Sequence, residues 1–160
     1  MVTPMRQQHT LRQPIQVSGI GLHGGQDVSV RLLPAPPNAG LSFTAAGQPD
    51  IPPLPARYDQ VIDTQLATTL GGEHFRVATV EHLLAALLAE GIDNALIEVS
   101  GEEIPVLDGS AAPWVEQLRA AGRTAQDTPR RTLVITAPVE VRDGDRCARL
   151  VPAEGLEVSA

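Results

Sequence analysis

Glu81 and His82 stand side by side in the segment Thr79-Val80-Glu81-His82-Leu83-Leu84, and the pair has the chemistry that a zinc hydrolase needs. A neutral imidazole is a common zinc ligand, and a carboxylate near the metal can accept a proton from water as that water attacks a carbonyl. Glu81 is therefore a candidate general base and His82 a candidate metal ligand. In the alternative interpretation, Glu81 only complements the positive end of a helix dipole, and His82 is a solvated polar residue.

A helix is expected to hold this pair, because the apolar residues around it repeat at i, i+3, i+4, i+7 and i+8. Thr79 is the expected N-cap, and Gly91 is the expected end of the helix. At about 100° per residue, His82 points away from the apolar stripe and Glu81 lies on its flank, so both side chains can face a cleft. The predicted stripe consists of Val80, Leu83, Leu84, Leu87 and Leu88.

Composition limits the class of protein. The chain has 160 residues, of which 42% are apolar and 19% charged, and this is typical of a globular protein with one ordinary core. The net charge of −7 and the absence of lysine argue against a general nucleic-acid surface. The N-terminal residues have no apolar signal region, and the longest apolar run, residues 83–89, is too short to cross a bilayer. We therefore expect a cytoplasmic protein without a transmembrane segment.

Strands and a second helix are expected around the Glu81–His82 helix. The glycine-rich loop Gly19-Ile20-Gly21-Leu22-His23-Gly24-Gly25 joins two of the strands. The second helix begins after Ser110 as its N-cap and ends at Gly122. Strands are predicted at residues 14–17, 27–33, 41–43, 66–70, 75–77 and 95–99.

The polar segment that follows predicts a boundary. A first unit is expected over residues 1–125, a linker over 126–131, and the start of a second unit over 132–160, beginning with strand patterning at 132–141. An internal echo suggests that the two units are alike, although strands reuse few residue types and the echo can be coincidence. Its two pairs are Pro14-Ile15-Gln16-Val17 with Pro138-Val139-Glu140-Val141, and Arg31-Leu32-Leu33-Pro34-Ala35 with Arg149-Leu150-Val151-Pro152-Ala153.

Four motifs together resemble the UDP-3-O-acyl-N-acetylglucosamine deacetylase family, and they occur in the family's order. They are the glycine-rich loop, the Thr79 to Leu84 segment, Gly91-Ile92-Asp93-Asn94, and Glu103-Ile104-Pro105-Val106-Leu107-Asp108-Gly109-Ser110-Ala111. The family consists of zinc amidases of lipid A biosynthesis, which remove the N-acetyl group of UDP-3-O-acyl-N-acetylglucosamine. The resemblance implies an α+β fold: a two-layer unit of a β-sheet backed by two helices, with the beginning of a second similar unit.

The resemblance also implies roles for individual residues. Glu81 corresponds to the general base and His82 to a ligand of Zn²⁺. Gln65, Leu66 and Ala67 match a segment that contacts ligands near the metal, although a plain strand would explain them equally well. The family's other zinc ligands and a further catalytic histidine belong to its second unit and have no counterpart in this chain. We therefore expect an N-terminal portion of the enzyme that is inactive by itself.

Two other interpretations of the chain are open, and the roles of some individual residues are open as well. The chain can be a non-catalytic nucleotide-sugar-binding or regulatory half-domain. An RNA-binding α+β domain is disfavoured by the acidic balance. His23 is either substrate-proximal or part of a turn, and Glu103 and Asp108 are expected to be structural. Glu73-His74, which repeats the acid–imidazole pairing at a Gly-Gly turn, is expected to lie on a surface loop.

Overall fold

The computed structural model describes residues 6–155 and 157–159 of the chain. The chain divides into two compact units, Met1–Arg130 and Arg131–Ala160, and has the expected α+β composition. Neither helix in the described residues is long and apolar enough to cross a membrane. The elements are β1 (Gln7–Leu11), β2 (Ile15–Ile20), β3 (Asp27–Pro34), β4 (Leu41–Ala45), β5 (Leu54–Pro55), a 3-10 turn (Tyr58–Gln60), β6 (Val61–Asp63), β7 (Thr69–Gly71), β8 (Arg76–Val77), α1 (Glu81–Ala89), β9 (Ala95–Val99), α2 (Ala112–Ala121), β10 (Arg123–Pro129), β11 (Val139–Asp143) and β12 (Arg146–Leu150).

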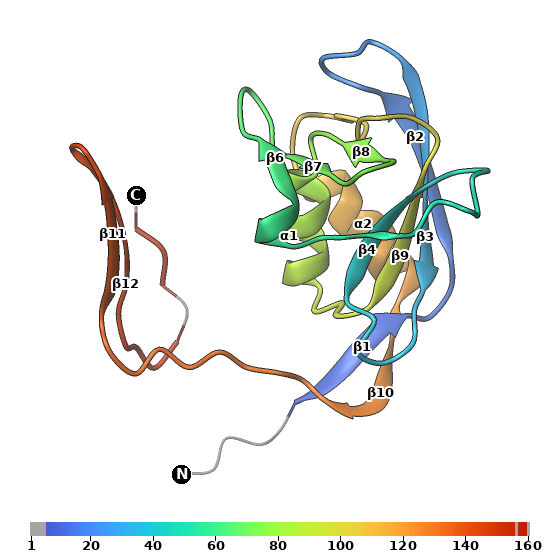
Figure 1. Cartoon of the computed structure of the whole chain (residues 1–160). Coiled ribbons are helices and arrows are strands. Elements are labelled where there is room, and N and C mark those ends of the chain that lie inside the picture. The colour runs from blue at the N-terminus through green and yellow to red at the C-terminus, as the bar shows by residue number, and fades with distance from the viewer. Residues whose placement is uncertain (1–5, 156, 160) are drawn as a thin grey trace. The chain divides into compact units, whose positions relative to one another are not determined.

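A five-stranded sheet in the order β2-β3-β9-β4-β5 forms the centre of the first unit. Its strands pair antiparallel except for β4 and β9, which are parallel. Both helices lie on one side of this sheet (Figure 1). Every second residue of β9 is fully buried, as expected for a strand with helices on one face. Trp114 of α2 and Phe43 of β4, both 0% exposed, are the largest side chains of the core.

Helix α1 has a narrower buried face than its apolar spacing predicts. Val80, Leu83 and Leu87 are buried as expected, and Leu84 is partly buried. Leu88, in contrast, is 65% exposed, so its place in the predicted stripe is wrong. The buried face is centred on Leu83 and Leu87, and Leu88 lies about 100° around the helix from Leu87, at the edge of that face.

The predicted end of α1 at Gly91 is confirmed. The N–H of Gly91 donates to the carbonyl of Leu88 at 3.1 Å, and the N–H of Ile92 donates to that of Leu87 at 2.9 Å. These are the two hydrogen bonds of a Schellman motif, which needs a left-handed residue after the helix. Gly91 takes that conformation, with φ 68°.

Replacing Gly91 with alanine is expected to lower the free energy of unfolding by about 1–2 kcal/mol, because a Cβ in the left-handed region crowds the following carbonyl and would also lie 2.6 Å from Nη1 of Arg123. Urea denaturation of the chain and its variant measures this difference. Gly72→Ala is the matched control, since Gly72 lies outside the positive-φ region and its added Cβ would meet nothing closer than 3.4 Å. An equal loss in both variants would contradict the conformational explanation.

The polar segment predicted as a linker over residues 126–131 is a strand through Pro129. Here β10 pairs antiparallel with β1 near the start of the chain, with Leu11 opposite Arg123 and His9 opposite Ala125. The composition of this segment is polar because most of its residues are exposed. Its strand character depends on a partner more than one hundred residues away, which local patterning does not reveal.

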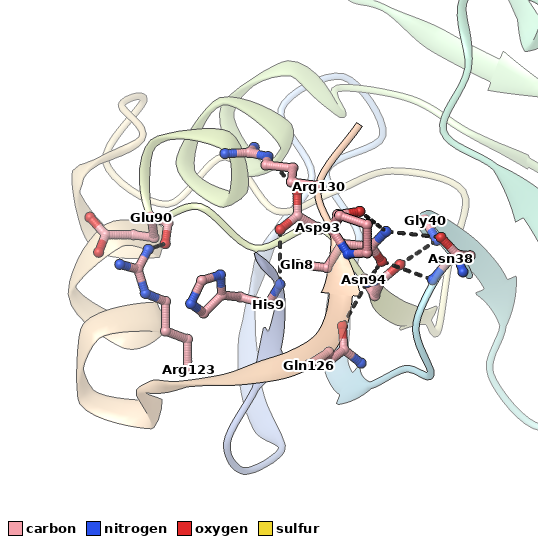
Figure 2. Close-up of polar contacts among 11 residues, drawn as sticks. Gln8, His9, Asn38, Gly40, Glu90, Asp93, Asn94, Arg123, Gln126 and Arg130 are labelled. Carbon is pink, nitrogen blue, oxygen red and sulfur yellow. Dashed lines mark hydrogen bonds and ion pairs between the residues drawn. The ribbon is translucent and has the colours of Figure 1, made fainter. Parts of the chain in front are cut away.

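A buried amide network holds β10 to the rest of the first unit (Figure 2). Asn94 is 1% exposed, and its side-chain amide donates to Gln8 Oε1 at 2.8 Å and to Gln126 Oε1 at 2.7 Å. Its Oδ1 accepts from the N–H of Gly40 at 2.8 Å, and its carbonyl accepts from the Thr10 hydroxyl. The network explains Asn94 in the Gly91-Ile92-Asp93-Asn94 motif as a structural residue.

The second unit contains the hairpin of β11 and β12, so the strand predicted from residue 132 begins only at Val139. Its register repeats that of β2 and β3: Val139 lies opposite Leu150 as Ile15 lies opposite Leu32. Likewise, residues 140 and 149 pair as residues 16 and 31 do. The segments that are similar in sequence therefore also pair in the same register.

The second hairpin differs from the first in burial. Leu32 of β3 is 0% exposed, whereas its counterpart Leu150 is 55% exposed, and Val139 and Val141 are exposed to a similar degree. Within the described part of the second unit, no helix or further strand offers a layer against which these side chains could pack.

Candidate functional site

Glu81 and His82 are the first two residues of α1, and both are half-buried. Oε2 of Glu81 accepts a hydrogen bond from the N–H of Thr68 at 3.2 Å. The carbonyl of Thr68 in turn accepts from the N–H of Val80 at 3.5 Å. Thr68 is therefore hydrogen-bonded to the start of α1 through both its N–H and its carbonyl. One carboxylate oxygen of Glu81 is oriented in this way, and no hydrogen bond engages Oε1 among the described residues.

The predicted N-cap role of Thr79 is wrong. The residue before the helix is Val80, which is helical (φ −79°, ψ −16°) and gives no side-chain cap. Thr79 lies one residue earlier in a left-handed conformation, with φ 59°. Its hydroxyl donates to Oε1 of Glu103 at 3.0 Å. A β-branched residue in that region is strained, and it persists where surrounding contacts fix it. Here the Glu103 carboxylate is such a contact.

Glu103 connects three of the four motifs. Besides Thr79, its carboxylate accepts the backbone N–H groups of His23 at 3.0 Å and Gly24 at 2.9 Å, both in the glycine-rich loop. A Cβ on Gly21 would lie 2.5 Å from Oε2 of Glu103, so a glycine is required where the loop passes this side chain. The Glu103 carboxylate thus joins the loop that carries His23 to Thr79, two residues before the first residue of α1.

Burial alone raises the pKa of Glu103, because it disfavours the charged form. The hydrogen bonds from Gly24, His23 and Thr79 outweigh burial, and His23 adds an electrostatic contribution, so the pKa lies below its ordinary value of 4.5. Glu103 is 8% exposed and is held as a carboxylate at neutral pH. It is therefore a structural anion in the fold, as the sequence predicts.

Asp108 lies near His82 and also closes the turn before α2. Its Oδ1 accepts from the N–H and the hydroxyl of Ser110, both at 2.9 Å. These bonds hold the pKa of Asp108 below its ordinary value, and an electrostatic interaction with His82 contributes in the same direction. Ser110 was the predicted N-cap of α2, but that position belongs to Ala111. The Ser110 hydroxyl instead accepts from the N–H of Ala112 at 3.1 Å.

The candidate substrate residues are placed unevenly around Glu81. Ala67 is buried and directly precedes Thr68, whereas Gln65 is exposed. Leu66 is 89% exposed with φ 63°, and it precedes β7 instead of belonging to the predicted strand. His23 is tied to this region through its backbone, and its side chain makes no hydrogen bond to Glu81 or His82. Sequence reasoning missed Thr68, because a backbone donor leaves no signal in residue type.

The glycine-rich loop also borders a cavity of about 740 Å³, which Glu81 and His82 do not line. The lining residues of the cavity include Gly21, His23, Asp63, Arg76 and Glu103.

Glu73 and His74 lie in the turn between β7 and β8 with exposed side chains, as expected of a surface pair.

The donor set of this chain is a partial fit to a zinc ion. His82 offers an imidazole beside the Glu81 carboxylate, which suits zinc and a general base. Within residues 6–155 and 157–159, however, no group of three or more His, Cys, Asp or Glu side chains is arranged to hold a metal. A protein zinc site normally has three or four protein ligands. Any zinc at His82 therefore needs ligands from outside the described residues.

Comparisons with known proteins agree with the motifs. The family model LpxC, UDP-3-O-acyl N-acetylglycosamine deacetylase, matches residues 8–160. The chain is 45% identical over 155 residues to UDP-3-O-acyl-N-acetylglucosamine deacetylase of Saccharophagus degradans, covering 97% of this chain and 51% of the relative. It is 48% identical over 155 residues to the protein of that name from Idiomarina loihiensis, with 96% and 51% covered. The chain thus spans about half the length of the curated relatives it matches, and it belongs to the UDP-3-O-acyl N-acetylglycosamine deacetylase family.

Proposed function

We propose that this chain is the N-terminal half of a zinc-dependent amide hydrolase that removes the N-acetyl group of UDP-3-O-acyl-N-acetylglucosamine in lipid A biosynthesis. Membership of the family and the names of the relatives support this substrate and reaction. The observation that carries the proposal is the first turn of α1, where Thr68 orients the Glu81 carboxylate beside His82.

In the proposed mechanism, Glu81 is the general base. Thr68 holds Oε2, so Oε1 can accept the proton of the attacking water. His82 would hold the zinc ion, which when bound would polarise the amide carbonyl and activate that water.

We also propose that Gln65, Leu66, Ala67 and His23 contact the substrate. The segment that contains the first three ends at Thr68 and so adjoins Glu81. Leu66 is 89% exposed, so its side chain is accessible to a substrate. The backbone of His23 is fixed by Glu103, which would hold the loop that carries its imidazole in place.

The remaining metal ligands and the acid that protonates the departing amine would come from the second half of the protein. Two observations support this division: the chain spans about half of its relatives, and the apolar residues of the β11–β12 hairpin are exposed. We also propose a first unit over residues 1–125 and a second over residues 132–160; the compact division after Arg130 lies later than the first bound because β10 pairs with β1. The 160 residues alone are expected to show negligible turnover.

Zinc content and deacetylation of UDP-3-O-acyl-N-acetylglucosamine test the proposal. Both are measured for residues 1–160 and for a form extended through the second half, each with and without Glu81→Ala. Activity in the extended form only, lost with Glu81→Ala, is the expected result. An extended form that binds no zinc and is inactive would overturn the proposal and favour a non-catalytic nucleotide-sugar-binding or regulatory half-domain.

A further inference from the structure

A second cavity, of about 520 Å³, lies at the other end of α1 from Glu81 and His82. The nine residues of α1 separate the two places by about 13 Å along the helix axis. Three arginines and a histidine line the cavity, and no acidic side chain does. The chain as a whole has a net charge of −7, so this cluster of cationic side chains differs in sign from the average charge of the protein. The lining residues are Arg6, Gln7, His9, Gly91, Arg123 and Arg130.

Only one of these arginines is neutralised within the described part of the chain. Nε of Arg130 pairs with Oδ1 of Asp93 at 2.7 Å. Nη1 of Arg123 donates to the backbone carbonyl of Glu90 at 2.6 Å, while the Glu90 carboxylate pairs with Arg119. The side chain of Arg6 makes no ion pair with a described residue. Among the described residues, one carboxylate is therefore paired with the three guanidinium groups that line the cavity, which leaves two positive charges in excess.

The imidazole of His9 adds a hydrogen-bonding group at the centre of this cluster. Figure 2 shows its ring between Arg123 and the Asp93–Arg130 pair. The N–H of His9 donates to Asp93 Oδ2 at 2.9 Å, and its carbonyl accepts from the N–H of Asp93 at 2.8 Å, so the backbone is fixed. The ring is half-buried and makes no hydrogen bond to any described residue. It is available to donate to a ligand.

The cavity rests on a rigid base. His9 and Arg123 stand on the paired strands β1 and β10, and the buried Asn94 network joins both strands to the core (Figure 2). Gly91 contributes no side chain, and a Cβ at this position would lie 2.6 Å from Nη1 of Arg123. Groups held in place before binding lose less conformational entropy when the ligand arrives.

We propose that this cavity binds a phosphate-bearing anion through Arg6, Arg123 and His9. Guanidinium groups match phosphate oxygens with paired hydrogen bonds, and two uncompensated positive charges suit a doubly charged phosphate better than a single carboxylate. The volume is large enough for a phosphate group with an attached organic part. The site is distinct from the proposed zinc chemistry and does not depend on it.

The test uses the ¹⁵N-labelled 160-residue chain at neutral pH and constant ionic strength, titrated with inorganic phosphate and with pyrophosphate. Saturable shifts of the backbone amides of His9, Gly91 and Arg123 are expected. Arg123→Gln and Arg6→Gln are each expected to weaken binding about tenfold, the effect of losing one charge-assisted contact of roughly 1.4 kcal/mol. Arg149→Gln, which removes an exposed arginine of the second unit, is the matched control and is expected to change nothing.

Arg6→Gln is the decisive variant, because the exposed Arg6 side chain makes no bond that the fold needs, whereas Arg123 also binds the Glu90 carbonyl. Shifts that fail to saturate with either anion, or equal weakening by Arg149→Gln and Arg6→Gln, would overturn the proposal. Sedimentation with phosphatidic acid vesicles identifies the source of the phosphate. Binding that is lost in the Arg6→Gln, Arg123→Gln double variant would assign a lipid headgroup, and saturable binding of the free anions alone would assign a soluble phosphate.

Discussion

Glu81→Gln in the extended form of the enzyme is expected to lower kcat by about 10²- to 10⁴-fold, the usual contribution of a general base. Glutamine has nearly the shape of glutamate and can still accept the Thr68 N–H, but it cannot take up a proton. Zinc content and KM are expected to change little, because His82 and the substrate contacts remain. Steady-state deacetylation kinetics together with metal analysis measure the three quantities.

The chain provides a matched control for this experiment in Glu73→Gln. Glu73 also precedes a histidine, but it is in the exposed turn between β7 and β8, with a side chain 87% exposed. Its replacement is expected to leave kcat unchanged. A comparable loss in both variants, or an unchanged rate in Glu81→Gln, would contradict the assignment of Glu81 as the base.

Glu103→Ala is expected to destabilise the first unit by about 3 kcal/mol, because three donors lose a charged acceptor in a buried place. The orphaned groups are the N–H groups of His23 and Gly24 and the hydroxyl of Thr79. Urea denaturation of the 160-residue chain measures the loss. Glu102→Ala is the control: Glu102 is next in the chain and ion-paired with Arg76, but its side chain is 67% exposed, so a change below about 1 kcal/mol is expected.

The pH dependence gives an independent measure of the same contacts. Because the pKa of Glu103 is lowered by folding, its contribution to stability is present above the ordinary value of 4.5 and is lost as the pH falls through the lowered pKa. The acid limb of the stability curve is therefore expected to be shallower in Glu103→Ala than in Glu102→Ala. Identical acid limbs would show that the folded carboxylate is not stabilised in the way its hydrogen bonds indicate.

Sequence patterns predicted the elements that local chemistry determines. The two strands around the glycine-rich loop, the strand Ala95–Val99 and the ends of both helices at Gly91 and Gly122 are all present. Each depends on a short alternation or on one residue that tolerates positive φ. The Glu81–His82 pair was likewise found from residue type and helical spacing, and the structure places it in the first turn of α1.

The features that the sequence did not reveal depend on distant partners. Thr79 has the residue type of an N-cap, but its hydroxyl donates a hydrogen bond to Glu103, which is 24 positions later in the chain. The polar residues of β10 are recognisable as a strand only once β1 is beside them. The orientation of Glu81 depends on a backbone N–H at Thr68, which any residue except proline could supply.

The matching registers of the β2–β3 and β11–β12 hairpins have a consequence for how the first unit could acquire a site. Residues 144–145 suffice to connect β11 and β12, whereas residues 21–26 connect β2 and β3 with the same strand pairing. The same strand pairing is therefore compatible with a connection of two residues and with one of six. The longer connection includes His23 and Gly24, whose N–H groups donate to the Glu103 carboxylate. A hairpin of this register can thus carry a longer loop, and in the first unit that loop supplies the contacts to Glu103 without a change in strand pairing.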